Sequence, residues 1–533
     1  MKAHNLLGPL AFSMFVIGES QDTFRINFKV LTGNDRSDLS FSDRTTYIMK
    51  RDSSEMELQN RQTFYLANIK IGSNEDEVGV LVDTGSSDLW IMSHDLNCES
   101  TSSSSKRDIL VDSKLPNEGD SDRKKIISEN NDLEHLEHIS ESSVKIEGNV
   151  RQILKSSNDN CTRYGSFRVS NSNSFNRNES ANPFSINYAD GTHARGFWGT
   201  DDVSFGNVTV RGLSFAVSND TSSDIGVLGI GLSGLETTYS SQYGGNYQYE
   251  NLPLKLKNQG TINKALYSVY LGEEDSRTGT ILFGAVDSAK YSGDLQTVKI
   301  VNSAINYGYS EPIRIEVIVN GITLNDSNTE IQIASNDYTA VLDTGSTYSY
   351  FPRSLLTSLG ESLNGQFSSS LGAYIVDCID DDDDSYVAID FSGFKINVPL
   401  RSLIQRYSYN QCFLSVLQQS GSDYILFGDN VLRSAYLVYD LDDFEISIAQ
   451  ARYTTEEDIS VISSSVPNAI QAPGYSSTSL PSSADGSGGS DSTFGDDSNS
   501  GGRSSSASMN KVSKAKLYSL FIGLGLLVPL SVY

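Results

Sequence analysis

Short apolar segments separated by glycine and asparagine occur along the chain from about residue 61 to residue 451. Examples are residues 63–72 (TFYLANIKIG) and residues 78–82 (VGVLV). Segments of this kind, rich in β-branched and aromatic residues and bounded by turn residues, predict β-strands. Few segments show the 3.6-residue apolar period of an amphipathic helix. The pattern therefore predicts a mainly β body of nearly four hundred residues.

Three stretches depart from this pattern. Residues 21–51 are polar and end in Lys50-Arg51, a dibasic pair that predicts a propeptide released by a processing protease. Residues 99–160 contain a hydroxyl-rich run, basic clusters and little apolar periodicity, which predicts an exposed insertion. Residues 456–506 are rich in Ser, Gly and Asp and predict a flexible stalk.

Both ends of the chain carry apolar segments. Residues 1–20 contain one early lysine, an apolar stretch from Leu6 to Ile17 and a small-residue end, which is typical of a secretory signal peptide. The alternative is a buried N-terminal helix. Residues 507–533 end in an apolar block after a polar spacer, and small residues precede them, as in a GPI-anchor signal with Ser506 as the candidate attachment residue. The alternative here is a tail-anchored helix. The two ends together predict export through the secretory pathway to the plasma membrane or the cell wall.

Composition excludes several classes of protein. The 533 residues include 67 acidic and 40 basic side chains, which gives a formal net charge of −27. This excess argues against nucleic-acid binding, because phosphates attract positive surfaces. The five histidines form no H-E-x-x-H zinc motif, and no G-x-S-x-G serine-hydrolase motif occurs. The sequence therefore predicts no metal and no cofactor.

Cysteines and glycosylation sequons agree with an exported chain. Four cysteines allow three pairings, and because two lie in each half of the body we expect Cys98–Cys161 and Cys378–Cys412. The first bridge would close the base of the insertion, and each bridge is expected to contribute on the order of 3–4 kcal/mol. The N-glycosylation sequons are at Asn160, Asn178, Asn207, Asn219 and Asn325.

One short sequence occurs twice, once in each half of the body. Residues 80–91 read VLVDTGSSDLWI and residues 340–351 read AVLDTGSTYSYF, so an apolar strand, a D-T-G-S turn and a following aromatic residue are repeated. A single D-T-G is usually an ordinary turn. Two copies, centred on Asp83 and Asp343, predict a composite site.

The repeated residues suit a pair of carboxyl groups that share one water molecule. Gly85 and Gly345 permit tight turns that bring backbone N–H groups toward each carboxyl group. Two like charges so close cannot both ionise, so the pair is expected to share one proton. One carboxylate would take a proton from the water that attacks a peptide carbonyl, while the other group stabilises the developing oxyanion. The supporting hydroxyls, expected to bond the carboxylates and the opposite loop, belong to Thr84, Ser86, Thr344 and Ser346.

These motifs resemble those of the pepsin-like aspartic endopeptidases over residues 60–455. INYADGT at residues 186–192 is similar to the flap hairpin of that family, with Tyr188 as the tyrosine that closes over substrate. Trp90 stands where the family has the tryptophan that hydrogen-bonds this tyrosine. The flap reads Tyr-Ala-Asp-Gly rather than the Tyr-Gly-Thr-Gly of many digestive members, so the chemistry near Asp190 and Gly191 is expected to differ.

The resemblance also implies the architecture. It implies a bilobal, mainly β fold with the active-site cleft between two lobes, formed here by residues 52–270, which include the insertion, and residues 271–455. Residues 224–231 and 425–433 are similar to the strands that pass behind the two Asp loops. The Cys378–Cys412 pair fits the disulfide of the second lobe.

Within that family, the chain most resembles the yapsins, which are GPI-anchored fungal surface proteases. The dibasic propeptide end, the insertion, the stalk and the anchor signal all fit. The resemblance implies a monomeric endopeptidase that cleaves peptide or protein substrates after Lys or Arg. Acidic candidates for attracting these side chains are Asp190 and the run Asp380, Asp381, Asp382, Asp383 and Asp384.

Three alternatives remain open at this point. The acidic run is equally typical of a solvated loop. Basic clusters within residues 99–160 are either self-cleavage sites, which would give two disulfide-linked chains, or parts of an exposed charged loop. The whole chain could also be a catalytically inactive, aspartic-protease-like protein of the cell wall or of adhesion.

Overall fold

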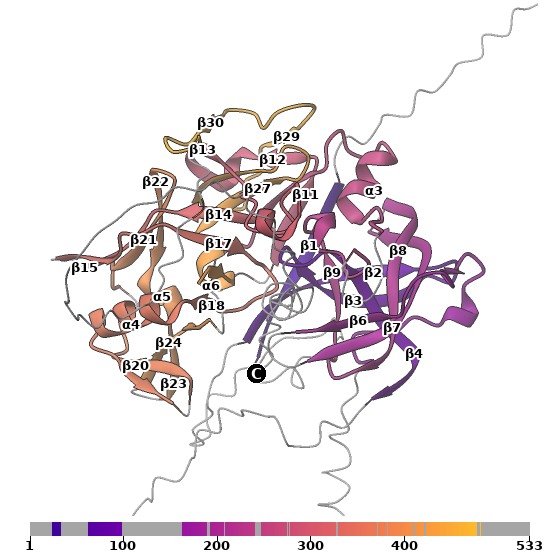
Figure 1. The fold of residues 1–533 in the computed structure, drawn as a ribbon, viewed down its shortest axis with the longest axis horizontal. Helices are drawn as coiled ribbons and strands as arrows, with labels where there is room; N and C mark the ends of the chain where they lie inside the picture. Colours follow the sequence, from indigo (N-terminus) through magenta and orange to yellow (C-terminus); the bar gives the residue numbers. More distant parts are fainter. Residues whose placement is uncertain are drawn as a thin grey trace, which may run out of the picture.

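Strands make up most of the ordered part of the molecule. The computed structural model describes residues 24–33, 62–98, 162–476 and 480, apart from gaps at 189–191, 207, 240–246, 274–275, 277, 327–328, 370, 381, 409–410 and 420–422. The strands of the N-terminal half, indigo to magenta, lie on one side of Figure 1, and the orange strands of the C-terminal half lie on the other. None of the helices in these residues is long and apolar enough to cross a membrane. The bilobal, mainly β fold predicted from the sequence is confirmed.

A 15-stranded sheet carries the N-terminal lobe and joins it to the C-terminal lobe. Its order is β30-β13-β28-β27-β10-β11-β1-β2-β3-β9-β4-β8-β7-β5, with β6 paired to β7. The bounds are β1 (Phe24–Gly33), β2 (Gln62–Ile71), β3 (Asp76–Asp83), β4 (Leu89–Cys98), β5 (Asn176–Arg177), β6 (Phe184–Asn187), β7 (His193–Phe205), β8 (Val208–Thr221), β9 (Gly226–Gly229), β10 (Leu266–Tyr270), β11 (Thr278–Phe283), β13 (Tyr291–Lys299), β27 (Ala435–Asp440), β28 (Glu445–Ala451) and β30 (Ala469–Gln471).

Smaller sheets build most of the C-terminal lobe. One contains β14 (Glu316–Val319), β17 (Tyr338–Leu342), β26 (Ile425–Phe427), β18 (Ser349–Phe351) and β25 (Val416–Gln418). A second contains β16 (Thr329–Ala334), β15 (Gly321–Asp326), β21 (Tyr386–Phe391) and β22 (Phe394–Pro399). A third contains β19 (Gln366–Ser368), β20 (Ala373–Val376), β24 (Gln411–Leu414) and β23 (Ile404–Ser408). A short pair is formed by β12 (Ala285–Asp287) and β29 (Ile459–Val461).

The helices in the described residues are short. The α-helices are α3 (Leu252–Asn258), α4 (Arg353–Ser362), α5 (Leu400–Leu403) and α6 (Asp429–Leu432). The 3₁₀ turns are η3 (Val169–Asn171), η4 (Ser233–Leu235), η6 (Ser288–Lys290) and η7 (Ile305–Tyr307).

The two strands that lead into the D-T-G-S turns occupy equivalent positions. β3 pairs in parallel with β9, and β17 pairs in parallel with β26. Strands buried on both faces need continuous rather than alternating apolar residues. This explains VGVLV and AVL in the sequence, whose residues are all buried. Residues 224–231 and 425–433 therefore pass behind the two turns, as expected.

The strand β1 lies in the segment expected to be a propeptide. It pairs with β11 on one side and β2 on the other, near the middle of the view in Figure 1. Phe24 and Ile26 are buried in the main core, and the Phe24 ring lies 5.4 Å from that of Phe283 and 5.6 Å from that of Phe205. Residues upstream of Lys50-Arg51 thus contribute an interior strand to the fold of the full chain.

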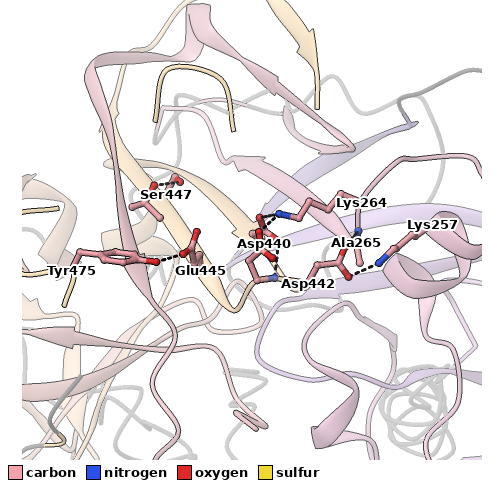
Figure 2. Close-up of polar contacts among 10 residues, drawn as sticks. Lys257, Lys264, Ala265, Asp440, Asp442, Glu445, Ser447 and Tyr475 are labelled. Atoms are coloured by element: carbon pink, nitrogen blue, oxygen red, sulfur yellow. Dashed lines mark hydrogen bonds and ion pairs between the residues drawn. The ribbon is translucent and has the colours of Figure 1, made fainter. Parts of the chain in front are cut away.

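The C-terminal lobe extends beyond the expected start of the stalk at residue 456. β29 pairs with β12, and β30 pairs in parallel with β13. Ile462 and Ala472 are buried, and the Tyr475 hydroxyl donates a hydrogen bond to Glu445 (Figure 2). The Ser/Gly/Asp-rich texture begins near residue 476, and the apolar residues before it are sufficient to form this additional layer.

The turn between β27 and β28 holds the end of the N-terminal lobe. Lys257 Nζ, at the end of α3, lies 2.8 Å from Asp442 Oδ1, and the backbone N–H of Ala265 donates to Asp442 Oδ2 at 3.0 Å. Lys264 is buried and contacts Asp440 and Asp443 (Figure 2). Because buried charges are costly unless paired, these contacts fix the turn against the N-terminal lobe.

Candidate active site

The two D-T-G-S turns face one another at the ends of β3 and β17. Behind the first turn, the N–H of Ile230 donates to Asp83 O at 2.9 Å. Behind the second turn, the N–H of Asp343 donates to Phe427 O at 3.0 Å. Each turn is therefore anchored to a neighbouring strand of its own lobe.

Reciprocal hydrogen bonds join the two turns. The N–H of Thr84 donates to Thr344 Oγ1 at 3.2 Å, and the N–H of Thr344 donates to Thr84 Oγ1 at 3.0 Å. The same hydroxyls donate onward, Thr84 Oγ1 to Leu342 O at 2.8 Å and Thr344 Oγ1 to Val82 O at 3.1 Å. Because all these groups are buried, the four bonds fix the separation and the relative rotation of the two turns.

Each carboxyl group is held by its own turn. The N–H of Gly85 donates to Asp83 Oδ1 at 2.7 Å, and the N–H of Gly345 donates to Asp343 Oδ1 at 2.8 Å. The serine hydroxyl three residues after each aspartate donates to the other oxygen, Ser86 to Asp83 and Ser346 to Asp343. The predicted supporting residues are thus all in contact with the two aspartates or with the opposite turn.

Glycine is required at both turns because each carboxyl group lies against the other turn. A Cβ atom at Gly85 would lie 2.6 Å from Asp343 Oδ1, and one at Gly345 would lie 2.7 Å from Asp83 Oδ1. These distances are well inside van der Waals contact, so a side chain at either position would push the two carboxyl groups apart.

The two aspartates have unequal environments although their local sequences match. Both are fully buried, and burial raises the pKa of each. The negative charge of Asp83 raises the pKa of Asp343 further, whereas a hydrogen bond from Asp343 lowers that of Asp83. We therefore expect Asp343 to carry the shared proton and Asp83 to be the carboxylate.

The tyrosine and tryptophan singled out in the sequence are in contact. Tyr188 follows β6, and its N–H donates to Thr192 O at 2.7 Å, which closes the hairpin formed by β6 and β7. Trp90 Nε1 donates to Tyr188 Oη at 2.6 Å, and both side chains are buried. We call β6, β7 and the residues between them the flap hairpin. Asp190 and Gly191 lie outside the described residues.

The acidic run and the second-lobe cysteines both lie in the C-terminal lobe. Within the connection from β20 to β21, Asp380, Asp382 and Asp384 are exposed and Asp383 is half-buried, whereas Asp381 lies outside the described residues. The Cys378–Cys412 disulfide is present, with Cα atoms 5.1 Å apart, as predicted. The side chains of the predicted Cys98–Cys161 pair lie outside the described residues.

The structure describes some of the predicted glycosylation sites. Asn219 is exposed, and Asn178 and Asn325 are half-buried. The Asn178 amide donates to Tyr247 Oη at 3.3 Å. The structure does not describe Asn160, Asn207 or Ser506.

A second pair of buried carboxyl groups lies beside the first turn and could not be predicted from the sequence. Asp88 and Glu236 are 3% and 1% exposed, and Tyr249 contacts both. The only available signal was the position of Asp88 in the same loop as Asp83. Nothing in the local sequence SGLETTY distinguishes Glu236 from an exposed glutamate.

A bilobal β fold with two aspartates at facing D-T-G-S turns defines the class of aspartic peptidases. The chain belongs to this class as a member of the eukaryotic aspartyl protease family, whose model matches residues 64–451. It is an aspartic-type endopeptidase.

Relatives match over most of the chain. It is 46% identical to secreted aspartic protease 9 of Candida albicans over 481 residues, which cover 83% of this chain and 87% of the relative. It is 41% identical to aspartic proteinase 3 of Saccharomyces cerevisiae over 440 residues, covering 80% and 76% of the two chains. It is 37% identical to aspartic proteinase yapsin-3 of the same yeast over 426 residues, covering 79% and 73%.

Proposed function

We propose that Asp83 and Asp343 are the catalytic pair of this endopeptidase. Asp83 takes a proton from a water molecule, whose oxygen attacks the peptide carbonyl carbon, while protonated Asp343 donates a hydrogen bond to the carbonyl oxygen as negative charge develops there. Collapse of the tetrahedral intermediate breaks the C–N bond, and the leaving nitrogen receives a proton from the pair. Products are a new carboxyl terminus and a new amino terminus.

The observation that carries this proposal is the geometry of two fully buried carboxyl groups that face one another and are held by one hydrogen-bond network. A general base and a general acid are needed in the same step, and neighbouring carboxyl groups with pKa values driven apart can supply both. The cross-linked threonines keep the pair in place during the reaction. An inactive wall or adhesion protein would not require this arrangement.

Substitution of each aspartate tests these roles. Asp83→Asn and Asp343→Asn should each abolish hydrolysis of a fluorogenic peptide while leaving the thermal unfolding profile of a folded protein. Asp294→Asn, on the exposed part of β13, is the matched control and should retain full activity. Hydrolysis by either dyad variant at the rate of the control would refute the assignment.

We further propose that cleavage follows Lys or Arg in precursor or cell-surface proteins. Support comes from the acidic side chains at residues 380–384, several of which are exposed, and from the similarity to the relative named yapsin-3. A positively charged side chain is drawn to such a loop by long-range attraction that weakens with salt. Asp190 is the second candidate.

A matched pair of peptides tests the specificity. Peptides that differ only in Arg or norleucine before the scissile bond should show a large preference for Arg, and replacing Asp380, Asp382, Asp383 and Asp384 by Asn should reduce it. An unchanged Arg preference in this quadruple variant would remove the acidic run from the specificity site and leave Asp190→Asn as the next variant.

We also propose that the protein is exported, processed after Arg51 and held at the cell surface by a GPI anchor. The similarity to the relative named secreted aspartic protease 9 supports export. The full chain should be released from the cell surface by a phosphatidylinositol-specific phospholipase, whereas a chain that ends at residue 503 should appear in the medium. Cell-surface protein that resists the phospholipase would point to a wall linkage or a spanning tail.

A further inference from the structure

Asp88 and Glu236 form a buried acidic pair outside the proposed catalytic dyad. Asp88 lies five residues after Asp83 in the same loop, and Glu236 follows η4. The N–H of Thr237 donates to Asp88 Oδ2 at 3.0 Å, and the N–H of Tyr249 donates to Glu236 Oε2 at 2.9 Å. The segment that begins at Glu236 is thereby attached to the loop that carries Asp83.

Tyr249 links this pair to the flap hairpin. Its hydroxyl donates to Asp88 Oδ1 at 2.6 Å, and its ring lies 5.3 Å from the Trp198 ring on β7. Trp198 packs edge-to-face on Phe184 of β6 at 5.4 Å. Tyr249 therefore contacts the Asp83 loop through its hydroxyl and the flap hairpin through its ring.

Trp90 makes a second contact between the Asp83 loop and the flap hairpin. Trp90 lies two residues beyond Asp88, its ring is 6.3 Å from Phe184, and its Nε1 donates to Tyr188 Oη at 2.6 Å. The Asp83 loop and the flap hairpin are thus joined through two side chains, Tyr249 and Trp90, which meet in one buried cluster around Phe184. Packed side chains have few alternative arrangements. A displacement of the flap hairpin is therefore transmitted to the Asp83 loop through the aromatic rings that contact both.

We propose that Tyr249 is a positioning residue for catalysis, which holds the Asp83 loop and the flap hairpin in their productive relative placement. This role rests on the proposed functions of Asp83 and Tyr188. Tyr249 itself touches neither the dyad nor the flap tyrosine in the described contacts, so its effect passes through Asp88 on one side and through Trp198 on the other.

The charges in this cluster favour a persistent bond. Burial and the nearby Asp88 charge raise the pKa of Glu236 to about 10, so Glu236 stays protonated at acidic and neutral pH. Burial also raises the pKa of Asp88 and that of Tyr249. Tyr247 is the other titratable group that these carboxyl groups influence. The Tyr249 hydroxyl therefore keeps its proton and remains a hydrogen-bond donor to Asp88.

The test removes the hydroxyl and keeps the ring. Tyr249→Phe should lower kcat/KM by about 10-fold, with most of the loss in kcat, because a small displacement of reacting groups has a large effect on rate. Tyr249→Leu, which also removes the ring contact with Trp198, should lose more. Asp88→Asn keeps an acceptor oxygen for Tyr249 and should retain more activity than Tyr249→Phe.

A matched control separates positioning from a general loss of stability. Tyr436, in the C-terminal lobe, is a buried tyrosine, whereas Tyr249 is half-buried; the Tyr436 hydroxyl donates to Ser268 Oγ at 2.9 Å and accepts from the N–H of Asp287 at 2.7 Å. Tyr436→Phe should lower the melting temperature to a similar extent as Tyr249→Phe and leave kcat/KM unchanged. Equal kinetic losses in the two variants would reduce Tyr249 to an ordinary structural residue and overturn the proposal.

Tryptophan fluorescence gives a readout that does not depend on turnover. The chain has two tryptophans, Trp90 and Trp198, and both take part in the contacts between the Asp83 loop and the flap hairpin. Tyr249→Phe should shift their emission, and Tyr436→Phe should not. An unshifted emission with unchanged kinetics, beside an inactive Asp83→Asn variant, would refute the role of Tyr249 alone. Retained hydrolysis in Asp83→Asn would instead refute the proposed dyad, and with it the role of Tyr249 in positioning it.

Discussion

The buried Glu236 predicts that the N-terminal lobe loses stability as pH rises from acidic to neutral values. The pKa of Glu236 is raised from 4.5 to about 10, chiefly by burial. Above pH 4.5 the unfolded chain releases this proton, whereas the folded chain keeps it. The unfolded state therefore binds fewer protons than the native state, and stability falls with rising pH across the window from 4.5 to about 10.

The loss of stability depends on the number of pH units that are crossed above pH 4.5. Each pH unit within it costs about 1.4 kcal/mol, so the step from pH 4.5 to pH 7 costs roughly 3 kcal/mol. This is a large share of the 5–15 kcal/mol that typically separates folded from unfolded domains. Glu236→Gln removes the titration but keeps an oxygen that accepts from the N–H of Tyr249. The variant should therefore gain stability over the natural protein at pH 7 and not at pH 4.5.

Urea unfolding followed by tryptophan emission is the appropriate assay. Trp90 and Trp198 both lie in the N-terminal lobe, so their emission reports the lobe that contains Glu236. The difference between the natural protein and Glu236→Gln should grow by about 1.4 kcal/mol per pH unit above pH 4.5. Glu330→Gln, at an exposed position of β16, is the control and should follow the natural protein. Parallel pH profiles for the natural protein and Glu236→Gln would refute the reasoning.

Three further predictions follow from the described contacts. Gly85→Ala should lower kcat by at least about 100-fold in a protein that still folds, because the new Cβ would lie 2.6 Å from Asp343 Oδ1; a kcat near that of the natural protein would mean that the turn can yield at no cost. Cys412→Ser should lower the free energy of unfolding in urea by about 3–4 kcal/mol, as expected for a bridge with a sequence separation of 34, and reduction of the natural protein should cost at least as much; a variant as stable as the natural protein would contradict this contribution. Phe24→Ala should cost about 3–4 kcal/mol in the full chain, measured by thermal unfolding before and after cleavage at Arg51. If the cost disappears after cleavage, β1 leaves the sheet on processing; a full chain that tolerates Phe24→Ala would contradict the burial of this ring.

The sequence identified those parts of the site that depend on local chemistry. The D-T-G-S turns, Trp90 and Tyr188 could be found because each needs particular residue types at fixed spacing. Glu236 could not be found, because its burial depends on the return of the chain at Tyr249 and on the loop that carries Asp88. A glutamate between a leucine and two threonines has the same local pattern whether it is exposed or buried.

The fold could be predicted from the sequence to a similar extent as the site. Alternating and continuous apolar segments predicted a β body, and the repeat predicted two related halves. The interior position of β1 was not predictable from its polar neighbourhood, because pairing with β2 and β11 is a long-range property. Residues 459–475 were expected in the stalk for the same reason: a few apolar residues such as Ile462 form a layer only where another surface is available.

The unequal dyad shows why the repeat alone could not assign the roles of its two aspartates. Asp83 and Asp343 have the same following residues, the same glycine N–H donor and the same serine donor. The charge of Asp83 raises the pKa of Asp343 only because the two turns meet, since neither turn alone brings a second carboxyl group near its aspartate. The more distant carboxyl groups on the two sides also differ: the charge of Asp343 reaches Asp429 in the C-terminal lobe, whereas Asp88 is engaged by Tyr249 in the N-terminal lobe. The roles that we propose for the two aspartates therefore depend on the lobes that surround the turns and not on the motif itself.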